Sequence, residues 1–452
     1  MRLRKTITTI VATAILLAGW QLFAVIANQP ELIPSLPRLV RTLCEWLVSG
    51  SFYQSVGATI LRGVLGMSIS FVCAIGMAGL FARFEWVYEL FRPLLAIMRS
   101  IPVISFILLA LIFLNPESIP LMIAFLTMFP LLTENLTRGI LDLRPGLSIM
   151  ARQFHIRRSN VLFQIIYPQL KPFLYSGLAS AAGFGWRAII MGEVLSQCAF
   201  GIGSEMKRAQ NFIAVPELLA WTIVAVFISF FFDKGISKVA DITPKISFAN
   251  EDQTIPTPTL SVLDTKDISY QYGIQHFSHS FQKGIIYGIS APSGKGKTTL
   301  LNLIGGILLP TEGEIHPTRH FGIATIFQQP QLLPHLTAEE NIILPLSSFL
   351  TEEKARRIAQ KHLQEMEMEP FGNRYPKELS YGQQQRIAIA RALAYPSPLL
   401  LMDEPFKGLD EALSHRIIER IREMQMKEER IILFTSHNPD EIRLLADEVI
   451  YL

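Results

Sequence analysis

The segment 290–306, SAPSGKGKTTLLNLIGG, holds the residues of this chain whose types and spacing are best suited to chemistry. A short apolar stretch, GIIYGIS, leads into its glycine-rich loop, and the apolar stretch LLNLIGGILL follows. This order predicts a strand, a loop and a helix, with backbone N–H groups of the loop and helix start holding phosphate oxygens. Lys297 would neutralise the β and γ oxygens, and the Thr298 hydroxyl would ligate Mg²⁺. The phosphate-binding residues expected here are Ser293, Gly294, Lys295, Gly296, Lys297, Thr298 and Thr299.

The loop departs at one position from the pattern G-x-x-x-x-G-K-[ST], because Ala291 stands where the first glycine is expected. This change removes no phosphate-binding group. It matters only if the backbone at this position needs a positive φ or has no room for a methyl group. The loop alone leaves a second interpretation open, namely a glycine-rich turn that caps an ordinary helix.

Two adjacent carboxylates follow a second apolar stretch, in LLLMDEP. If LLLM is a buried strand, Asp403 and Glu404 lie at its carboxyl end, where open α/β sheets bind ligands and where the phosphate loop is also expected. One carboxylate can then serve the metal and the other the attacking water. The alternative is that both are solvated turn residues.

Four more motifs occur in order after the loop. They are IFQQPQLLPHLTAEENI with Gln328, LSYGQQQRIAIARAL from Leu379, GLD ending at Asp410, and FTSH with His437. Together with the loop and the carboxylates, they make residues 260–452 resemble an ATP-binding cassette ATPase. The resemblance implies an α/β P-loop domain that binds ATP and Mg²⁺ and hydrolyses ATP.

The resemblance also implies roles for individual side chains. Tyr272 would stack on adenine, and Asp403 would hold Mg²⁺ through water. Glu404 would polarise the attacking water, and His437 would contact the γ-phosphate. Gln328 is implied as a further ligand of nucleotide and metal, and Asp410 as a further nucleotide contact.

The signature motif has Tyr381 where the family's LSGGQ has its first glycine. Ser380, Gly382 and Gln383 match the motif. In this family the signature closes over ATP bound to a different cassette, so these residues and the following helix N-terminus act in trans. Since this chain carries one cassette, the resemblance implies a second copy of the chain as its partner.

The first 235 residues have few charges, and the later ones have an ordinary share, which predicts a membrane domain followed by a soluble one. About six membrane helices are expected, because a span needs about 20 residues and flanking charges can snorkel. The apolar runs cover 6–30, 63–82, 100–116, 118–133, 172–186 and 218–232. The first run exceeds the length of a signal-peptide core, which favours an uncleaved helix over a cleaved signal.

The placement of lysine and arginine predicts how the helices are oriented. Residues 138–171 hold six basic residues and one acid. Basic loops stay in the cytoplasm, so the N-terminus, this loop and the C-terminal half are expected inside, in a multi-pass protein of the cytoplasmic (inner) membrane. The polar, proline-containing stretch after the last run predicts a linker. The expected domains are a permease over 1–240, a linker over 241–258 and a cassette over 259–452.

The membrane half resembles the permeases of nitrate, sulfonate and taurine type importers. The stretches that carry the likeness are LRGVLGMSISF, MRSIPVISFILLALIF and QIIYPQLKPFLYSGL. The resemblance implies a small-molecule solute delivered by an extracytoplasmic solute-binding protein. The EAA---G pattern of such importers, counted back from Pro168, survives here only as Ala151 and the proline. A membrane-anchored ABC ATPase that senses or regulates without moving solute is the alternative.

The loop with the weakest family match, 149–160, places Met150, Phe154 and Arg157 on one face of a helix. An apolar pair beside arginines favours insertion into a groove of the cassette near Gln328, with Phe154 as anchor. The alternative is a basic loop that only sets topology.

Other residues limit the classes of function. The net charge is +3, and no basic patch alternates with aromatic residues, so nucleic acid is not an expected partner. The three cysteines, Cys44, Cys73 and Cys198, lack the spacing of a metal or redox site. Arg187 and Glu193 follow the fifth run and lie in the fifth expected span, where charges are expensive. They either pair between helices or, in the case of Arg187, contact an anion.

Overall fold

The computed structural model describes residues 2–240, 244–253, 260–271, 273–292, 294–317 and 322–452. The chain folds into two compact units. The first is Met1–Leu143 with Gln169–Thr243, and the second is Arg144–Pro168 with Pro244–Leu452. The segment 144–168, which interrupts the helical half in sequence, therefore folds with the second unit.

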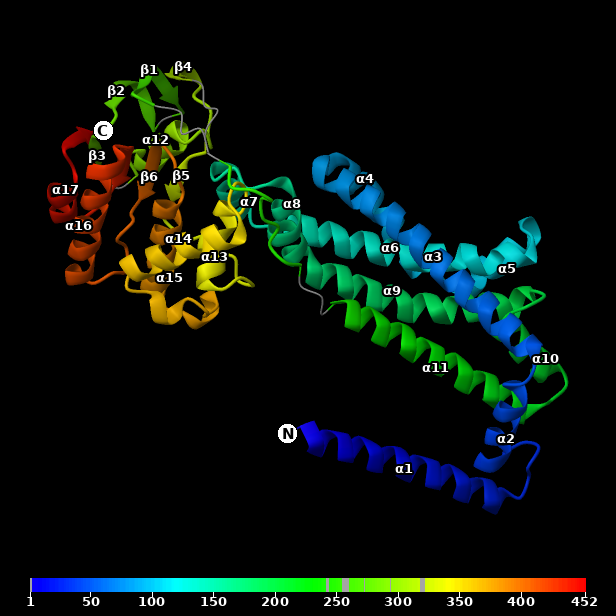
Figure 1. Cartoon of the computed structure of the whole chain (residues 1–452). Helices are drawn as coiled ribbons and strands as arrows, with labels where there is room; N and C mark the ends of the chain where they lie inside the picture. Colours follow the sequence, from blue (N-terminus) through cyan, green and yellow to red (C-terminus); the bar gives the residue numbers. More distant parts are fainter. Residues whose placement is uncertain (1, 241–243, 254–259, 272, 293, 318–321) are drawn as a thin grey trace. The chain divides into compact units, whose positions relative to one another are not determined.

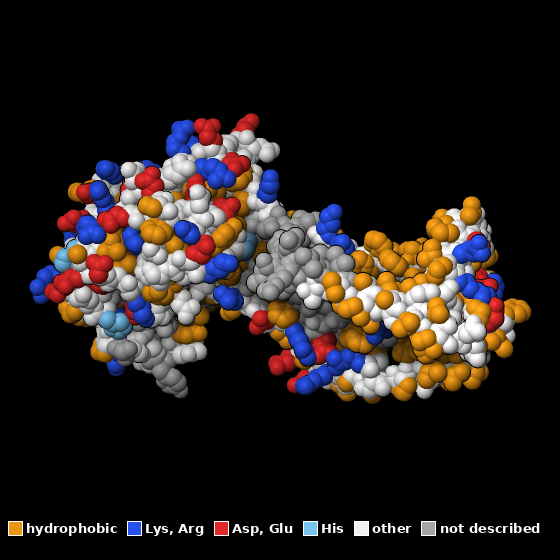
Figure 2. All heavy atoms as spheres, turned by 90° about the horizontal axis from the view of Figure 1, so that it is seen from below, with side chains coloured by type: hydrophobic (Ala, Val, Ile, Leu, Met, Phe, Trp, Pro, Cys, Tyr) orange, Lys and Arg blue, Asp and Glu red, His pale blue; other side chains and the backbone are white. Residues whose placement is uncertain are grey.

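The first unit is helical, and α3 and α6 pack along each other in it (Figure 1). Hydrophobic side chains gather on the surface of the first unit, whereas charges of both signs are spread over the second unit (Figure 2). Its elements are α1 (Arg2–Ala27), α2 (Leu36–Trp46), α3 (Gly50–Arg83), α4 (Glu85–Ser100), α5 (Val103–Phe113), η1 (Pro116–Ser118), α6 (Ile119–Leu141), α9 (Tyr167–Ser196), α10 (Ile202–Asn211) and α11 (Val215–Ala240).

Among the described residues, four helical stretches are long and apolar enough to cross a membrane. They are Gly50–Arg83, Pro116–Leu141, Arg158–Ser196 and Val215–Ala240. A fifth span requires α4 and α5 to act together, although they meet at 94°. The described apolar part of α1, Val11–Ala27, is shorter than the others. The expectation of about six membrane helices is therefore met only in part.

The membrane helix expected over 100–116 is not continuous. The chain breaks at Ile101, which is extended with ψ 129°, and α5 starts only after Pro102. Proline has no backbone N–H and disfavours the helical region for the residue before it. The break leaves α5 with 11 residues, too few to span a bilayer alone.

The second unit contains two sheets. A three-stranded antiparallel sheet has the order β2-β1-β4, and a five-stranded parallel sheet has the order β5-β6-β7-β3-β8. β6 and β7 are buried along their whole length, which explains why LLLM and IILF are continuous apolar runs. The strands are β1 (Val262–Tyr270), β2 (Ile274–Gln282), β3 (Ile286–Ser290), β4 (Glu312–His316), β5 (Ala324–Ile326), β6 (Leu399–Asp403), β7 (Ile431–Thr435) and β8 (Glu448–Tyr451).

Helices complete the unit, and α13, α14 and α15 form a group of their own away from the antiparallel sheet (Figure 1). The helices are α7 (Pro145–Gln153), α8 (Arg158–Asn160), η2 (Val161–Ile166), α12 (Lys297–Ile304), α13 (Ala338–Leu346), α14 (Glu352–Glu365), η3 (Glu369–Phe371), η4 (Pro376–Glu378), α15 (Tyr381–Ala394), α16 (Glu411–Glu428) and α17 (Pro439–Leu445). This arrangement confirms the predicted fold class, a helical membrane domain followed by an α/β P-loop cassette.

The 144–168 segment belongs to the core of this unit. Met150 and Phe154 are buried in its main hydrophobic cluster, and the Phe154 ring meets Tyr395 edge-on with centroids 5.2 Å apart. This burial confirms the predicted apolar pair. The single helix expected over 149–160 is wrong, because His155 takes φ 46° and turns the chain after α7. Arg157 consequently leaves that face, and its backbone N–H donates to Ser348 Oγ at 3.0 Å.

Candidate active site

The candidate site lies where three neighbouring parallel strands end. β7 pairs with both β6 and β3, and Thr435 is in register with Asp403 on one side and with Ile289 on the other. The carboxyl ends of these strands therefore meet at one edge of the sheet. This confirms the prediction that the acids of β6 lie beside the loop that follows β3.

The loop after β3 has the backbone conformation that its glycines predict. Gly294 and Gly296 have φ of 80° and 90°. A Cβ on Gly296 would lie 2.7 Å from the carbonyl oxygen of Gly273, so only glycine fits there. Ala291 is not among the described residues with positive φ. Its backbone therefore needs no glycine, which answers the question raised by the motif.

Lys297, the first residue of α12, is 7% exposed. Its Nζ donates to the carbonyl oxygen of Ala291 at 2.8 Å and lies 3.1 Å from Nδ1 of His437. No carboxylate forms an ion pair with it within the described residues. Its charge is therefore free for an anionic ligand at the loop.

Thr298 and Asp403 form the part of the site suited to a cation. The Thr298 hydroxyl donates to Asp403 Oδ2 at 2.9 Å, and the Thr435 hydroxyl donates to Asp403 Oδ1 at 2.8 Å. Burial raises the pKa of Asp403, while these two hydrogen bonds oppose the shift. Adjacent hydroxyl and carboxylate oxygens fit Mg²⁺, which binds one or two carboxylates and keeps its other positions for water and phosphate.

Glu404 is held in place by its backbone and by a histidine. Its φ is 49°, and its N–H donates to Thr435 Oγ1 at 3.1 Å. Its carboxylate lies 3.0 Å from His437 Nε2 and 3.4 Å from Lys407 Nζ. The left-handed backbone turns the chain at the strand end, so that Asp403 and Glu404 serve different partners.

The other predicted site residues have different positions in the described part of the chain. The Gln328 side chain has no hydrogen bond to Thr298 or Asp403 in the described chain, and the residue is exposed. Asp410 caps α16 by accepting from Leu413 N at 2.9 Å. Ser380 and Gln383 form a capping box at the start of α15, with Gly382 between them. Lys295 and Thr299 lie in the loop and the first turn of α12, and Tyr272 and Ser293 fall outside the described residues.

One residue of the site was missed from sequence. Thr435 is fully buried, and it accepts from Glu404 N while donating to Asp403. A hydroxyl at the end of the buried strand IILFT, two residues before His437, is the signal that could have found it.

The Ala291 methyl group is expected to be neutral for nucleotide binding. Ala291→Gly should leave ATP affinity nearly unchanged, because the backbone conformation already suits alanine and the phosphate-binding groups lie elsewhere. Lys297→Ala, by contrast, should abolish binding or hydrolysis. Titration of the purified protein with a fluorescent ATP analogue measures both, and a large gain in affinity with glycine would contradict the first expectation.

Glu193 and Arg187, the two charged residues expected within a membrane helix, have different surroundings. Glu193 is fully buried and accepts from Arg62 at 2.7 Å, from Thr59 at 2.9 Å and from Gly203 N at 2.9 Å. Arg62 also binds Glu117 at 2.7 Å. This network confirms pairing between helices for Glu193. Arg187 instead lines a cavity of about 700 Å³ and has no ion pair in the described part of the chain.

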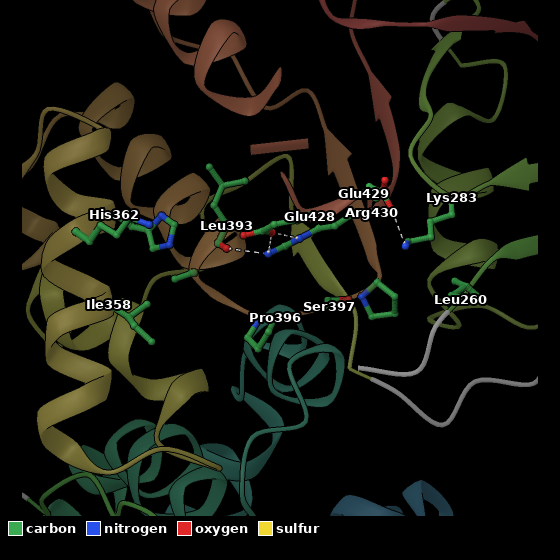
Figure 3. A pocket seen from close by; sticks show the side chains of 13 residues that line it. Leu260, Lys283, Ile358, His362, Leu393, Pro396, Ser397, Glu428, Glu429 and Arg430 are labelled. Carbon is green, nitrogen blue, oxygen red and sulfur yellow. Dashed lines mark hydrogen bonds and ion pairs between the residues drawn. The ribbon is translucent and has the colours of Figure 1, made fainter. Parts of the chain in front are cut away.

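A separate cavity of about 460 Å³ lies in the cassette (Figure 3). Among the described residues, its lining includes none of the loop residues or strand-end acids named above. Its charges are already paired, with Lys283 Nζ 2.7 Å from Glu429 and Arg430 Nη2 2.6 Å from Glu428. These two described cations are therefore already paired with carboxylates.

Comparison with known proteins gives two family matches. Residues 68–233 match the family described as binding-protein-dependent transport system inner membrane component, and residues 274–407 match the family described as ABC transporter. The two matches fall in the helical half and in the cassette.

Individual relatives match the cassette. The Fe(3+) ions import ATP-binding protein FbpC of Rhizobium etli is 35% identical over 189 residues, which are 40% of this chain and 54% of that protein. The thiamine import ATP-binding protein ThiQ of Yersinia pseudotuberculosis is 34% identical over 205 residues, 42% of this chain and 86% of that protein. An uncharacterized ABC transporter ATP-binding protein of Methanocaldococcus jannaschii is 34% identical over 201 residues, 40% of this chain and 85% of that protein.

The chain spans about half the length of the iron-import relatives and most of the length of the other two. The phosphate loop and the acids at the end of β6 lie within the matched residues 274–407, whereas the histidine after β7 lies beyond them. The chain therefore belongs to the ABC transporters, with a permease domain of the binding-protein-dependent type and an ATP-binding cassette joined in one polypeptide.

Proposed function

We propose that this chain is a half-transporter that imports a small solute across the cytoplasmic membrane and is driven by ATP hydrolysis. A second copy of the chain would complete the ATP sites, and an extracytoplasmic solute-binding protein would deliver the solute. The permease family match and the names of the import relatives support import. The finer type, handling nitrate, sulfonates or taurine, is proposed on the resemblance of residues 1–240.

The observation that carries this proposal is the position of the 144–168 segment. It lies in sequence between two candidate membrane helices, within the permease match, yet it folds in the cassette. Asn160 Nδ2 donates to Ser347 Oγ and to the Ser247 carbonyl oxygen, both at 2.8 Å, and Gln153 Nε2 donates to the Gly305 carbonyl oxygen at 2.8 Å. Such hydrogen bonds give a physical route by which changes in the cassette reach the permease helices.

The site residues have distinct proposed roles in hydrolysis. Lys297 holds the β and γ oxygens, and Thr298 with Asp403 holds Mg²⁺, which neutralises phosphate charge when bound. Glu404 orients and activates the attacking water, and His437, 3.0 Å from Glu404, contacts the γ-phosphate. Tyr272 would stack on adenine.

Basic residues support a cytoplasmic location for the cassette. Residues 138–171 carry six lysines or arginines, and this stretch contains the 144–168 segment that folds with the cassette. We therefore place the N-terminus, this segment and the cassette on the cytoplasmic side.

Uptake into proteoliposomes tests the proposal. Solute-binding proteins from the same cell are screened for stimulation of ATP turnover by the reconstituted chain, and the ligand of the active one is then radiolabelled. We expect ATP-dependent accumulation with the wild-type chain and none with Lys297→Ala. ATP turnover that no binding protein stimulates, without accumulation of solute, would instead support a membrane-anchored regulator.

The signature is expected to act in trans. Ser380 is exposed at the start of α15, and within the described chain it has no hydrogen bond to the phosphate-loop residues. A mixed dimer with Lys297→Ala in one chain and Ser380→Arg in the other should therefore keep one competent ATP site of two. Either homodimer should have none. Affinity purification with two different tags, followed by ATPase assay, measures this, and a fully active monomer would refute it.

A further inference from the structure

The segment 328–331, QQPQ, is held at both ends by side chains of one helix. Tyr381 Oη donates to the carbonyl oxygen of Gln328 at 2.8 Å. Arg391 Nη1 and Nη2 donate to the carbonyl oxygens of Gln331 at 2.8 Å and Pro330 at 2.9 Å. Tyr381 begins α15 and Arg391 lies in its last turn, about 15 Å further along at 1.5 Å per residue. The segment is therefore fastened to α15 at two separate points.

Arg391 is the fixed point of attachment. It is 1% exposed, and burial lowers its pKa to about 10, which leaves it charged at neutral pH. Its guanidinium carbon lies 5.5 Å from the centre of the Phe154 ring. One buried cation thus contacts both the 328–331 segment and the 144–168 segment. In the described part of the chain Arg391 pairs with no carboxylate, and its guanidinium is held by two carbonyl oxygens and lies near an aromatic ring.

Tyr381 is the point of attachment that distinguishes this chain from the LSGGQ pattern. Its ring packs on Gly408, where a Cβ would lie 2.7 Å from Tyr381 Cδ1, and Gly408 has φ 77°. Glycine at position 408 therefore both allows the left-handed backbone and leaves room for the tyrosine ring. A glycine at position 381 could supply neither this packing nor the hydrogen bond to Gln328.

We infer that Tyr381 is a positioning residue that locks the 328–331 segment to the start of α15. The start of α15, which carries the signature proposed to act on the partner's nucleotide, and the 328–331 segment then move as one body with Phe154. This inference rests on the proposed function and assigns a regulatory role within it. When one ATP site closes, the movement therefore reaches the 144–168 segment through the 328–331 segment, whose carbonyl oxygens accept hydrogen bonds from side chains of α15.

Hydrogen–deuterium exchange of the full-length, nucleotide-free protein tests whether the Tyr381 hydroxyl holds the 328–331 segment. Tyr381→Phe removes the hydroxyl and keeps the ring on Gly408. Amides in the peptide 326–334 should then exchange about fivefold faster, the effect of losing one neutral hydrogen bond. Tyr451→Phe, which removes the hydroxyl of a tyrosine that is 79% exposed, is the matched control and should leave this peptide unchanged. Equal exchange in Tyr381→Phe and wild type would overturn the inference.

ATP kinetics give a second readout. In the same variant the Hill coefficient for ATP turnover should fall toward one, and half-saturation should shift about fivefold, while the melting temperature stays close to wild type. Unchanged cooperativity in a chain that hydrolyses ATP normally would show that the ring only packs. Failure of the proposed function is distinguishable from this result, because the wild-type chain itself would then show no ATP-dependent uptake.

Discussion

Replacing Glu404 by glutamine is expected to lower the rate of ATP hydrolysis by at least about two orders of magnitude while ATP binding is retained. An amide has nearly the same shape as the carboxylate but cannot accept a proton from the attacking water. The binding groups stay in place, because Lys297 contacts the Ala291 carbonyl oxygen and His437, and Thr298 contacts Asp403. The backbone N–H of Glu404 keeps its bond to Thr435 in the variant.

Two measurements check this expectation. Phosphate release gives kcat, and equilibrium titration with a labelled nucleotide gives affinity. Glu419→Gln, at an exposed position of α16, makes the same chemical change away from the site and should leave both values at the wild-type level. Retained turnover in Glu404→Gln would show that another group activates the water.

Phe154→Ala is expected to abolish uptake while nucleotide binding and membrane insertion persist. The ring is completely buried between Tyr395 and the guanidinium of Arg391. Its removal leaves a cavity whose cost is about 3–5 kcal/mol for phenylalanine in a core. That loss loosens the 144–168 segment in the cassette. ATP turnover should consequently stop responding to the loaded solute-binding protein.

The readouts are stimulated ATPase activity, uptake into proteoliposomes and nucleotide affinity, measured on the same preparation. Phe154→Leu conserves most of the buried volume and should keep a substantial part of the stimulation, because volume-conserving substitutions in a core cost less. If stimulation and uptake both survive in Phe154→Ala, the coupling contact lies elsewhere in the molecule.

Sequence patterns with local causes predicted the fold class and the core of the site. Strand, loop and helix at 290–306 follow from apolar stretches on either side of a glycine-rich turn, and the structure has β3, the loop and α12 in that order. Met150 and Phe154 were predicted as a buried pair from their spacing, which depends only on helix periodicity.

Local sequence patterns predicted the helices less well where the backbone leaves the helical conformation. The apolar run 100–116 has the composition of a span, but Pro102 ends the helix that would cross and leaves α5 at 94° to α4. The left-handed His155 similarly separates Phe154 from Arg157. The apolar content of a window does not show where the backbone bends. A single residue whose φ and ψ are not helical changes the direction of the whole element.

The sequence by itself determined the order of elements, the burial of the parallel strands and the chemical types at the phosphate loop, because these depend on neighbours within a few residues. Only the tertiary structure decided which side chains meet. Asp403 accepts hydrogen bonds from residues 105 and 32 positions away, Thr298 and Thr435, and Tyr381 reaches a carbonyl 53 positions away. Such contacts are set by the order of β6, β7 and β3 in the sheet and by the packing of α15. Strand order and helix packing arise from the burial of apolar surface over the whole domain, which no local stretch of sequence encodes.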